Sequence, residues 1–195
     1  MKLFDMSDTS EIKVDDPGLK GYISIEPRLL AKSHGRMRAR FSKSKMNVVE
    51  RFITHLGIPG HRGKKHKVMT SHASGKYNKN AKIMIETMKE IERKTGKNPV
   101  QVIIKAIEHS APRDGVTVIE YGGARYPQAV DLSPSRRVDL AIRLLIHGAY
   151  DKAFNKKANI IQGLVSEIVA ASQNLPESLA VQKKNESEKQ ADSAR

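Results

Sequence analysis

The chain has 195 residues, a formal net charge of +14, no cysteine and only 5% aromatic residues. This length predicts one domain with enough chain to bury a core. The absence of cysteine excludes a disulfide framework, a cysteine zinc site and thiol catalysis. The N-terminus has no apolar signal region and no apolar run approaches ~20 residues, so we expect a cytoplasmic chain with no membrane partner.

The positive charge is concentrated in one stretch of the chain. Residues 28–82 hold 15 Lys and Arg against one acid, Glu50, whereas the rest of the chain holds 20 residues of each sign. Solubility alone would not require this segregation, but a polyanionic partner would. A solvated basic face and an anionic membrane surface are the alternatives. The near absence of acids and the closely spaced arginines favour nucleic acid over both.

The first predicted segment is an N-terminal extension, residues 1–46. We expect it to dock on the body through the apolar segment Tyr22–Ile25. Residues 28–45 are rich in Arg, Lys and Ser and hold few large apolar side chains, so they cannot bury enough surface to fold alone. The sequence therefore predicts a flexible basic extension that is partly disordered without its partner.

Five helices are predicted from apolar residues at helical spacing, over residues 47–56, 78–94, 98–110, 134–152 and 159–172. Their boundaries carry recognised signals: Asn47 caps the first helix, Gly96 closes the second, and Asn98-Pro99 starts the third. After Pro176, residues 177–195 are almost wholly polar. We expect a solvated tail there, or a helix that forms only on binding.

A β-hairpin is predicted between the third and fourth helices. Two β-branched runs, 116–121 and 125–130, flank Gly122-Gly123. Both residues of such a two-residue loop need positive φ, which glycine reaches without strain. The expected fold is all-α, a bundle of five to six helices over residues 47–176 with one protruding β-hairpin arm at 115–131.

No catalytic, cofactor or metal site is predicted. Gly75-Lys76 is followed by Tyr77 instead of the Ser or Thr of a phosphate loop, and Gly122-Gly123 does not join a strand to a helix. The histidines at 61, 66 and 72 have no helical i, i+4 spacing and lie among cations that would repel a metal ion. We therefore expect a protein that is not an enzyme and that has no cofactor.

Arginines at the start of the fourth helix indicate a binding site. Arg136 and Arg137 lie in the first turn, where acids would suit the positive helix N-terminus better, so their presence favours an anionic partner. Arg143 follows on the same helix, although an i, i+4 pair with Asp139 would also explain it. Charge alone adds seven candidate nucleic-acid contacts in the basic stretch: Arg36, Arg38, Arg40, Arg62, Lys64, Lys65 and Lys67.

Three strings together resemble one protein family: GKNPVQVIIKAIEHSAPR, then QAVDLSPSRRVDLAIRLL, then GLVSEIVAAS. The ordered block resembles small-subunit ribosomal protein seven, in the archaeal and eukaryotic branch, from about residue 47 to the C-terminus. The resemblance implies a helical fold that binds the 3′ major domain of small-subunit rRNA and nucleates assembly of the subunit head. It also implies a place near the exit-site tRNA and the mRNA exit path, beside other head proteins, as a monomer within the ribosome.

The resemblance also assigns residues. Matching motifs carry over rRNA contacts to Gly75, Lys76, Arg113, Arg136, Arg137 and Arg143, and Arg125 of the hairpin also lies in a matching motif. Tyr77 stands where the family has a basic residue, so position 77 receives no phosphate contact. The hairpin residues expected near tRNA and mRNA are Tyr121, Gly122, Gly123 and Arg125. An architectural DNA-binding protein with a β-arm is the alternative, which the single cation and the glycine tip without an apolar wedge argue against.

Overall fold

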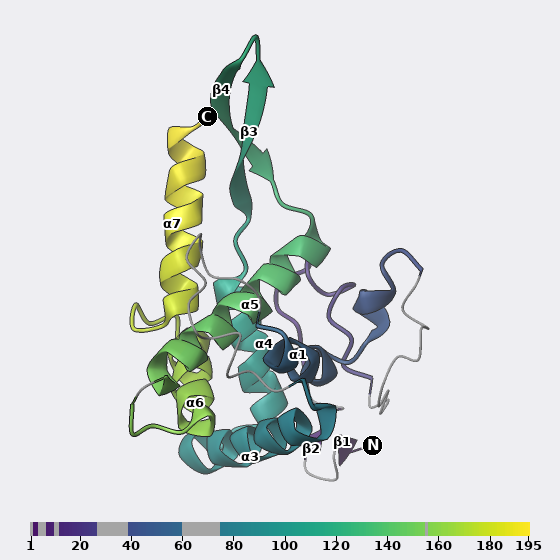
Figure 1. Cartoon of the computed structure of the whole chain (residues 1–195). Helices are drawn as coiled ribbons and strands as arrows, with labels where there is room; N and C mark the ends of the chain where they lie inside the picture. Colours follow the sequence, from purple (N-terminus) through teal and green to yellow (C-terminus); the bar gives the residue numbers. More distant parts are fainter. Residues whose placement is uncertain (1, 4–6, 10–11, 27–38, 60–74, 155) are drawn as a thin grey trace.

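The computed structural model describes residues 2–3, 7–9, 12–26, 39–59, 75–154 and 156–195. Within these ranges a helical body carries one long β-hairpin that projects from its end (Figure 1). The predicted all-α fold with a protruding hairpin is confirmed. The helices are η2 (Ser42–Lys45, a 3-10 helix), α1 (Val48–Gly57), α3 (Tyr77–Thr95), α4 (Pro99–Ser110), α5 (Pro134–Ala153), α6 (Ile160–Ser172) and α7 (Leu179–Ser193).

The predicted helix boundaries are confirmed by the capping contacts. The Asn47 side chain accepts a hydrogen bond from the backbone N–H of Val49, and Asn98 does the same for Val100. Gly96 ends α3 with a φ of 62°, a conformation that glycine adopts at little cost. These signals are local in the chain, which is why the sequence alone located them.

The core lies where the apolar stripes of five helices meet. Helices α5 and α6 pack together, and α6 also packs on α3 and α4. The predicted stripes supply the largest fully buried side chains, among them Phe52, Ile53, Leu56, Met84, Met88, Ile91, Ile103, Ile107, Ile142 and Leu145. Burial of large aliphatic and aromatic side chains is worth about 1.5–3 kcal/mol each before the loss of chain entropy is counted.

The hairpin consists of β3 (Asp114–Tyr121) and β4 (Ala124–Asp131), paired antiparallel with Tyr121 opposite Ala124. Gly122 and Gly123 have φ values of 57° and 82°, as the predicted two-residue turn requires. Most side chains on both strands are exposed. The arm therefore contributes little to the core and extends beyond the body (Figure 1).

The structure differs from the sequence prediction at the C-terminus. In place of a solvated tail, α7 runs along α5 and the lower part of the hairpin. The Ser178 hydroxyl caps α7, and Ala180, Val181 and Ala191 are buried. The hairpin amide of Ala129 donates to the Ala194 carbonyl at 3.3 Å. Composition did not reveal this packing because the buried residues are mostly small and most of the hydrogen bonds to the hairpin region use a backbone atom.

The described part of the N-terminal extension docks on the body, as expected. Leu19 and Ile23 are buried, and Tyr22 and Ile25 pack against the core. The Glu108 carboxylate on α4 accepts hydrogen bonds from the amides of Asp15 and Asp16. Two short strands, β1 (Lys2–Leu3) and β2 (Ser7–Asp8), pair near the start of the chain. Of the predicted flexible basic part at 28–45, residues 28–38 lie outside the described residues, and residues 42–45 form the short helix η2.

Candidate nucleic-acid interface

Much of the basic stretch lies outside the described residues, including Arg36, Arg38, Arg62, Lys64, Lys65 and Lys67. Of the candidates within the described part, Arg40, Gly75 and Lys76 are exposed. The guanidinium of Arg40 lies 5.9 Å from the centre of the exposed Phe41 ring. An exposed cation beside an exposed ring is suited to contact both the phosphates and the bases of a nucleic acid.

The arginine pair at the start of α5 has two different environments. Arg136 is exposed, but the Arg137 side chain is only 11% exposed. The Arg137 guanidinium donates to an Asp16 carboxylate oxygen at 3.0 Å and to the Pro112 carbonyl at 3.1 Å. This corrects the expectation that both arginines need an anionic partner outside the chain. For Arg137, the anion is Asp16 of the docked N-terminal segment.

A second ion-pair cluster joins α1 to α5. Arg51 is only 3% exposed, and its guanidinium donates to Asp139 at 2.9 Å and to the Tyr22 carbonyl at 3.0 Å. Lys43 of η2 and His55 of α1 each have a nitrogen 3.9 Å from the Asp139 carboxylate. Burial alone would raise the pKa of Asp139, but the neighbouring His55 and the hydrogen bond from Arg51, with the charges of Arg51 and Lys43, hold that pKa well below its usual range.

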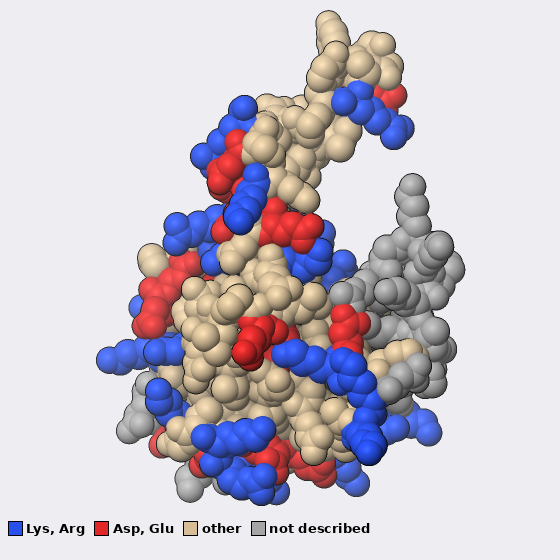
Figure 2. All heavy atoms as spheres, turned by 90° about the vertical axis from the view of Figure 1, so that its left-hand side faces the viewer, with Lys and Arg blue, Asp and Glu red and all other residues tan. Residues whose placement is uncertain are grey.

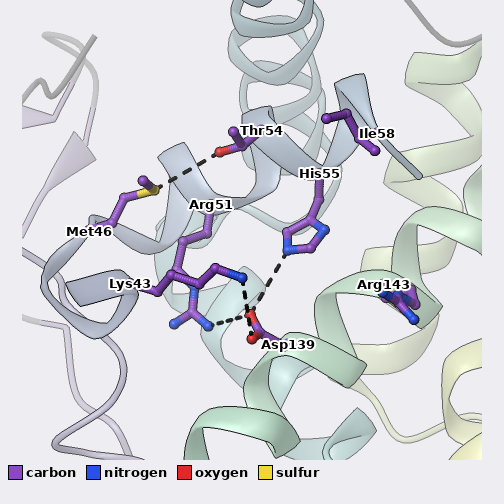
Figure 3. A pocket seen from close by; sticks show the side chains of 8 residues that line it. All are labelled: Lys43, Met46, Arg51, Thr54, His55, Ile58, Asp139 and Arg143. Carbon is purple, nitrogen blue, oxygen red and sulfur yellow. Dashed lines mark hydrogen bonds and ion pairs between the residues drawn. The ribbon is translucent and has the colours of Figure 1, made fainter. Parts of the chain in front are cut away.

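An open cavity of about 290 Å³ adjoins this cluster (Figure 3). Arg143 lies beyond Asp139 on α5, and no interaction is drawn between them (Figure 3). The alternative i, i+4 pair is therefore not formed, since Asp139 faces Arg51 instead. The cavity is lined by Lys43, Met46, Arg51, Thr54, His55, Ile58, Asp139 and Arg143.

The cavity wall has an excess of positive charge. Three permanent cations, Lys43, Arg51 and Arg143, share one carboxylate, so the balance is positive even when His55 is neutral. An anion at the rim would be attracted, whereas a metal cation would be repelled. The predictions identified only Arg143 of this group. Arg51 and Asp139 are 88 positions apart in the chain, and no local spacing indicates that they meet.

Tyr77 faces the interior, in keeping with its exclusion as a phosphate contact. Its hydroxyl donates to the buried Glu50 carboxylate at 3.3 Å. Burial, with the nearby Glu50 charge and hydrogen bond, raises the pKa of Tyr77 to about 12. Glu50, the only acid of the basic stretch, is thereby kept from the surface.

The hairpin offers a different kind of surface. Arg125 is paired with Glu120 at 3.5 Å, so the described tip carries no net charge. Tyr121 is 81% exposed beside Gly122-Gly123, which gives the tip an aromatic side chain. At the hairpin base, Arg113 is exposed and its amide donates to Glu188 of α7.

The face on the α7 side has both signs of charge. Figure 2 shows basic and acidic side chains intermixed over the body, with mostly uncharged atoms on the hairpin above. Such a face lacks the one-sided field that attracts a polyanion. Among the described residues, no helix is long and apolar enough to cross a membrane, and no three metal-binding side chains gather.

Comparison with known proteins identifies the family. Residues 27–195 match the family model described as ribosomal protein S7p/S5e. The small ribosomal subunit protein uS7 of Nanoarchaeum equitans is 47% identical, over 100% of this chain and 99% of that protein. Proteins of the same name from Methanosphaera stadtmanae and Archaeoglobus fulgidus are 41% and 42% identical over 99% of this chain and 98% and 94% of theirs. The chain therefore belongs to the ribosomal protein S7p/S5e family.

Proposed function

We propose that the chain is a structural protein of the small ribosomal subunit that binds rRNA directly in the 3′ major domain. The observation that carries this proposal is the family match over residues 27–195, with relatives alike along nearly their whole length. In this role the protein nucleates assembly of the subunit head as a single copy beside other head proteins. It works on cytoplasmic ribosomes and performs no catalytic step.

The geometry supports an electrostatic attachment to rRNA. Lys43 comes from the basic stretch and Arg143 from α5, yet both line the same cavity. Three further cations are exposed: Arg40, which precedes α1 in the sequence, Lys76, which follows it, and Arg136 at the start of α5. Arginine and lysine side chains in such positions neutralise phosphates and release counterions.

The hairpin supports a separate role in reaching toward the exit-site tRNA and the mRNA path. It projects away from the body, and its base is held by α7 (Figure 1). The tip has no net charge and presents Tyr121, which suits contact with bases more than attachment to phosphates. We assign primary rRNA binding to the body and this reach to the arm.

The test is a salt titration of binding between the full chain and a transcript of the small-subunit 3′ major domain. We expect the logarithm of the binding constant to fall linearly with the logarithm of salt concentration, with a slope of about −4 or steeper if ~6 phosphates are neutralised. Duplex DNA of equal length is the control and should bind more weakly. A flat salt dependence, or a preference for the DNA, would contradict the proposal.

A further inference from the structure

We propose that the cavity between η2, α1 and α5 holds one unstacked nucleotide of the rRNA. Its phosphate lies at the rim near Arg143 and Lys43, and its base lies against Ile58. This inference rests on the proposed rRNA binding and assigns a subsite within it. The volume of about 290 Å³ is at the small end of ligand pockets, which suits a single nucleotide better than a helix or a peptide segment.

The cations at the rim are available for a phosphate. The Asp139 carboxylate is already matched by Arg51 at 2.9 Å, which leaves the charges of Arg143 and the exposed Lys43 in excess. Arg143 has no hydrogen bond or ion pair with another described residue. A guanidinium can bind a phosphate through two parallel hydrogen bonds, and an ammonium can bind it as a point charge.

Arg51 also lines the cavity, but its guanidinium is engaged within the chain. It donates to Asp139 at 2.9 Å and to the Tyr22 carbonyl at 3.0 Å. The positive charge left for a ligand therefore comes from Arg143 and Lys43.

The apolar part of the wall suits the face of a base. Ile58 is 74% exposed and directly follows α1, so its apolar side chain is available to a ligand. Met46 lies across the cavity and offers a polarisable thioether (Figure 3). Apolar side chains beside free cations fit a ligand with a flat apolar face and an anionic group, which describes a nucleotide.

The surroundings favour RNA over an acidic protein segment. Lys43 precedes α1 in the chain and Ile58 follows it, and both line the cavity. The exposed Phe41 comes immediately before η2, and the Arg40 guanidinium lies near its ring. Unpaired bases that are splayed out of structured RNA stack on rings and guanidinium groups in this way.

The experiment compares two matched pairs of variants of the full chain on the 3′ major domain transcript. Ile58→Glu alters the cavity wall, and Leu175→Glu makes the same change at an exposed aliphatic residue between α6 and α7. Arg143→Ala removes the rim cation, and Arg93→Ala removes an exposed arginine of α3. Affinity is measured by filter binding, and the exposure of base edges by chemical probing of the transcript.

We expect Ile58→Glu to weaken binding by about tenfold or more and to abolish protection of one unpaired nucleotide, while Leu175→Glu keeps that protection. Arg143→Ala should reduce the salt slope by about one, and Arg93→Ala should not. Unchanged melting temperatures show that the variants fold.

Two results would overturn the inference while the proposed function stands. In the first, the wild-type chain binds the transcript and Ile58→Glu leaves both affinity and protections unchanged. In the second, Ile58→Glu weakens binding but leaves the protection of every nucleotide unchanged, which would show that no base occupies the cavity. Failure of the wild-type chain to bind the transcript would instead contradict the proposed function itself.

Discussion

Two carboxylates that join helices of the body, one buried and one partly exposed, have the same chemistry but different surroundings. Glu167 of α6 is fully buried, and its carboxylate lies 2.7 Å from Lys152 and from the Ser178 hydroxyl and 3.1 Å from the Ala180 amide. Asp139 of α5 is partly exposed and borders an open cavity. Glu167 is enclosed by its own chain, whereas the Asp139 cluster has cations left over.

The difference indicates that the Glu167 cluster stabilises the fold, whereas the Asp139 cluster can also bind a ligand. Around Glu167 one acid meets one cation and two donors, which join α5, α6 and the start of α7. A methyl group on Gly148 would lie 2.6 Å from this carboxylate, so even the backbone of α5 is packed against it. A closed and charge-balanced cluster has nothing to offer a ligand. An open cluster with excess charge does.

The largest effect is expected at the closed cluster. Glu167→Ala should lower the free energy of unfolding by about 3–5 kcal/mol, since it leaves Lys152 and two donors without their partner. Urea unfolding monitored by circular dichroism measures the loss. Glu177→Ala, at an exposed acid just before α7, is the control and should change little. If Glu167→Ala unfolds at the same urea concentration as the wild type, the Glu167 cluster does not stabilise the fold, and it does not differ from the Asp139 cluster in the way described above.

Arg137 should behave as part of the fold. Arg137→Ala should lower the free energy of unfolding by about 2–3 kcal/mol, because it breaks hydrogen bonds to Asp16 and Pro112 that are largely shielded from water. Arg136→Ala is the matched control and should leave the melting temperature unchanged while weakening rRNA binding. If both variants melt as the wild type does, the N-terminal segment is not held through Arg137.

The open cluster should give a smaller effect that depends on pH. The pKa of Asp139 is lower in the folded chain than its usual value of about 4, so the charged form stabilises the fold above about pH 4 and this contribution is lost as pH falls through the folded pKa. Asp139→Asn should cost about 1–2 kcal/mol near neutral pH, with a difference from wild type that shrinks in acid. Urea unfolding at several pH values measures it. A difference independent of pH would show that the carboxylate charge is not what stabilises the α1–α5 contact.

The smallest effect on stability is expected at the hairpin tip. Removal of residues 119–126 with a new Gly-Gly turn should change the free energy of unfolding by less than about 0.5 kcal/mol, because the tip strands are exposed. Binding to the 3′ major domain transcript should persist, whereas function on assembled subunits should suffer. Loss of transcript binding would place the tip in the primary contact and merge the two roles assigned here to body and arm.

Much of the fold could be predicted because its signals are local. Asn47, Asn98 and Gly96 mark helix ends, apolar spacing marks buried faces, and Gly122-Gly123 marks a turn. The position of α7 could not be predicted. Its buried residues are few and small, and its capping partner Glu167 belongs to another helix.

The candidate site likewise has one feature that the sequence predicts and one that only the fold decides. The concentration of cations in residues 28–82 is a property of the chain, and it indicates a polyanionic partner whatever the fold. Which arginine remains without an ion pair depends on the tertiary fold and cannot be read from the sequence. Arg137 and Arg143 lie on the same helix. Asp16 forms an ion pair with Arg137, whereas no described residue forms one with Arg143.

The sequence by itself determined five of the helices, the hairpin, the net charge and the family, because each depends on neighbouring residues or on their order. Only the tertiary structure decided which charges are consumed within the chain and which remain at an open cavity. The physical reason is that an ion pair forms wherever folding brings opposite charges within about 4 Å. The pairs of Arg51 with Asp139 and of Arg137 with Asp16 span 88 and 121 positions, a separation that no sequence period encodes.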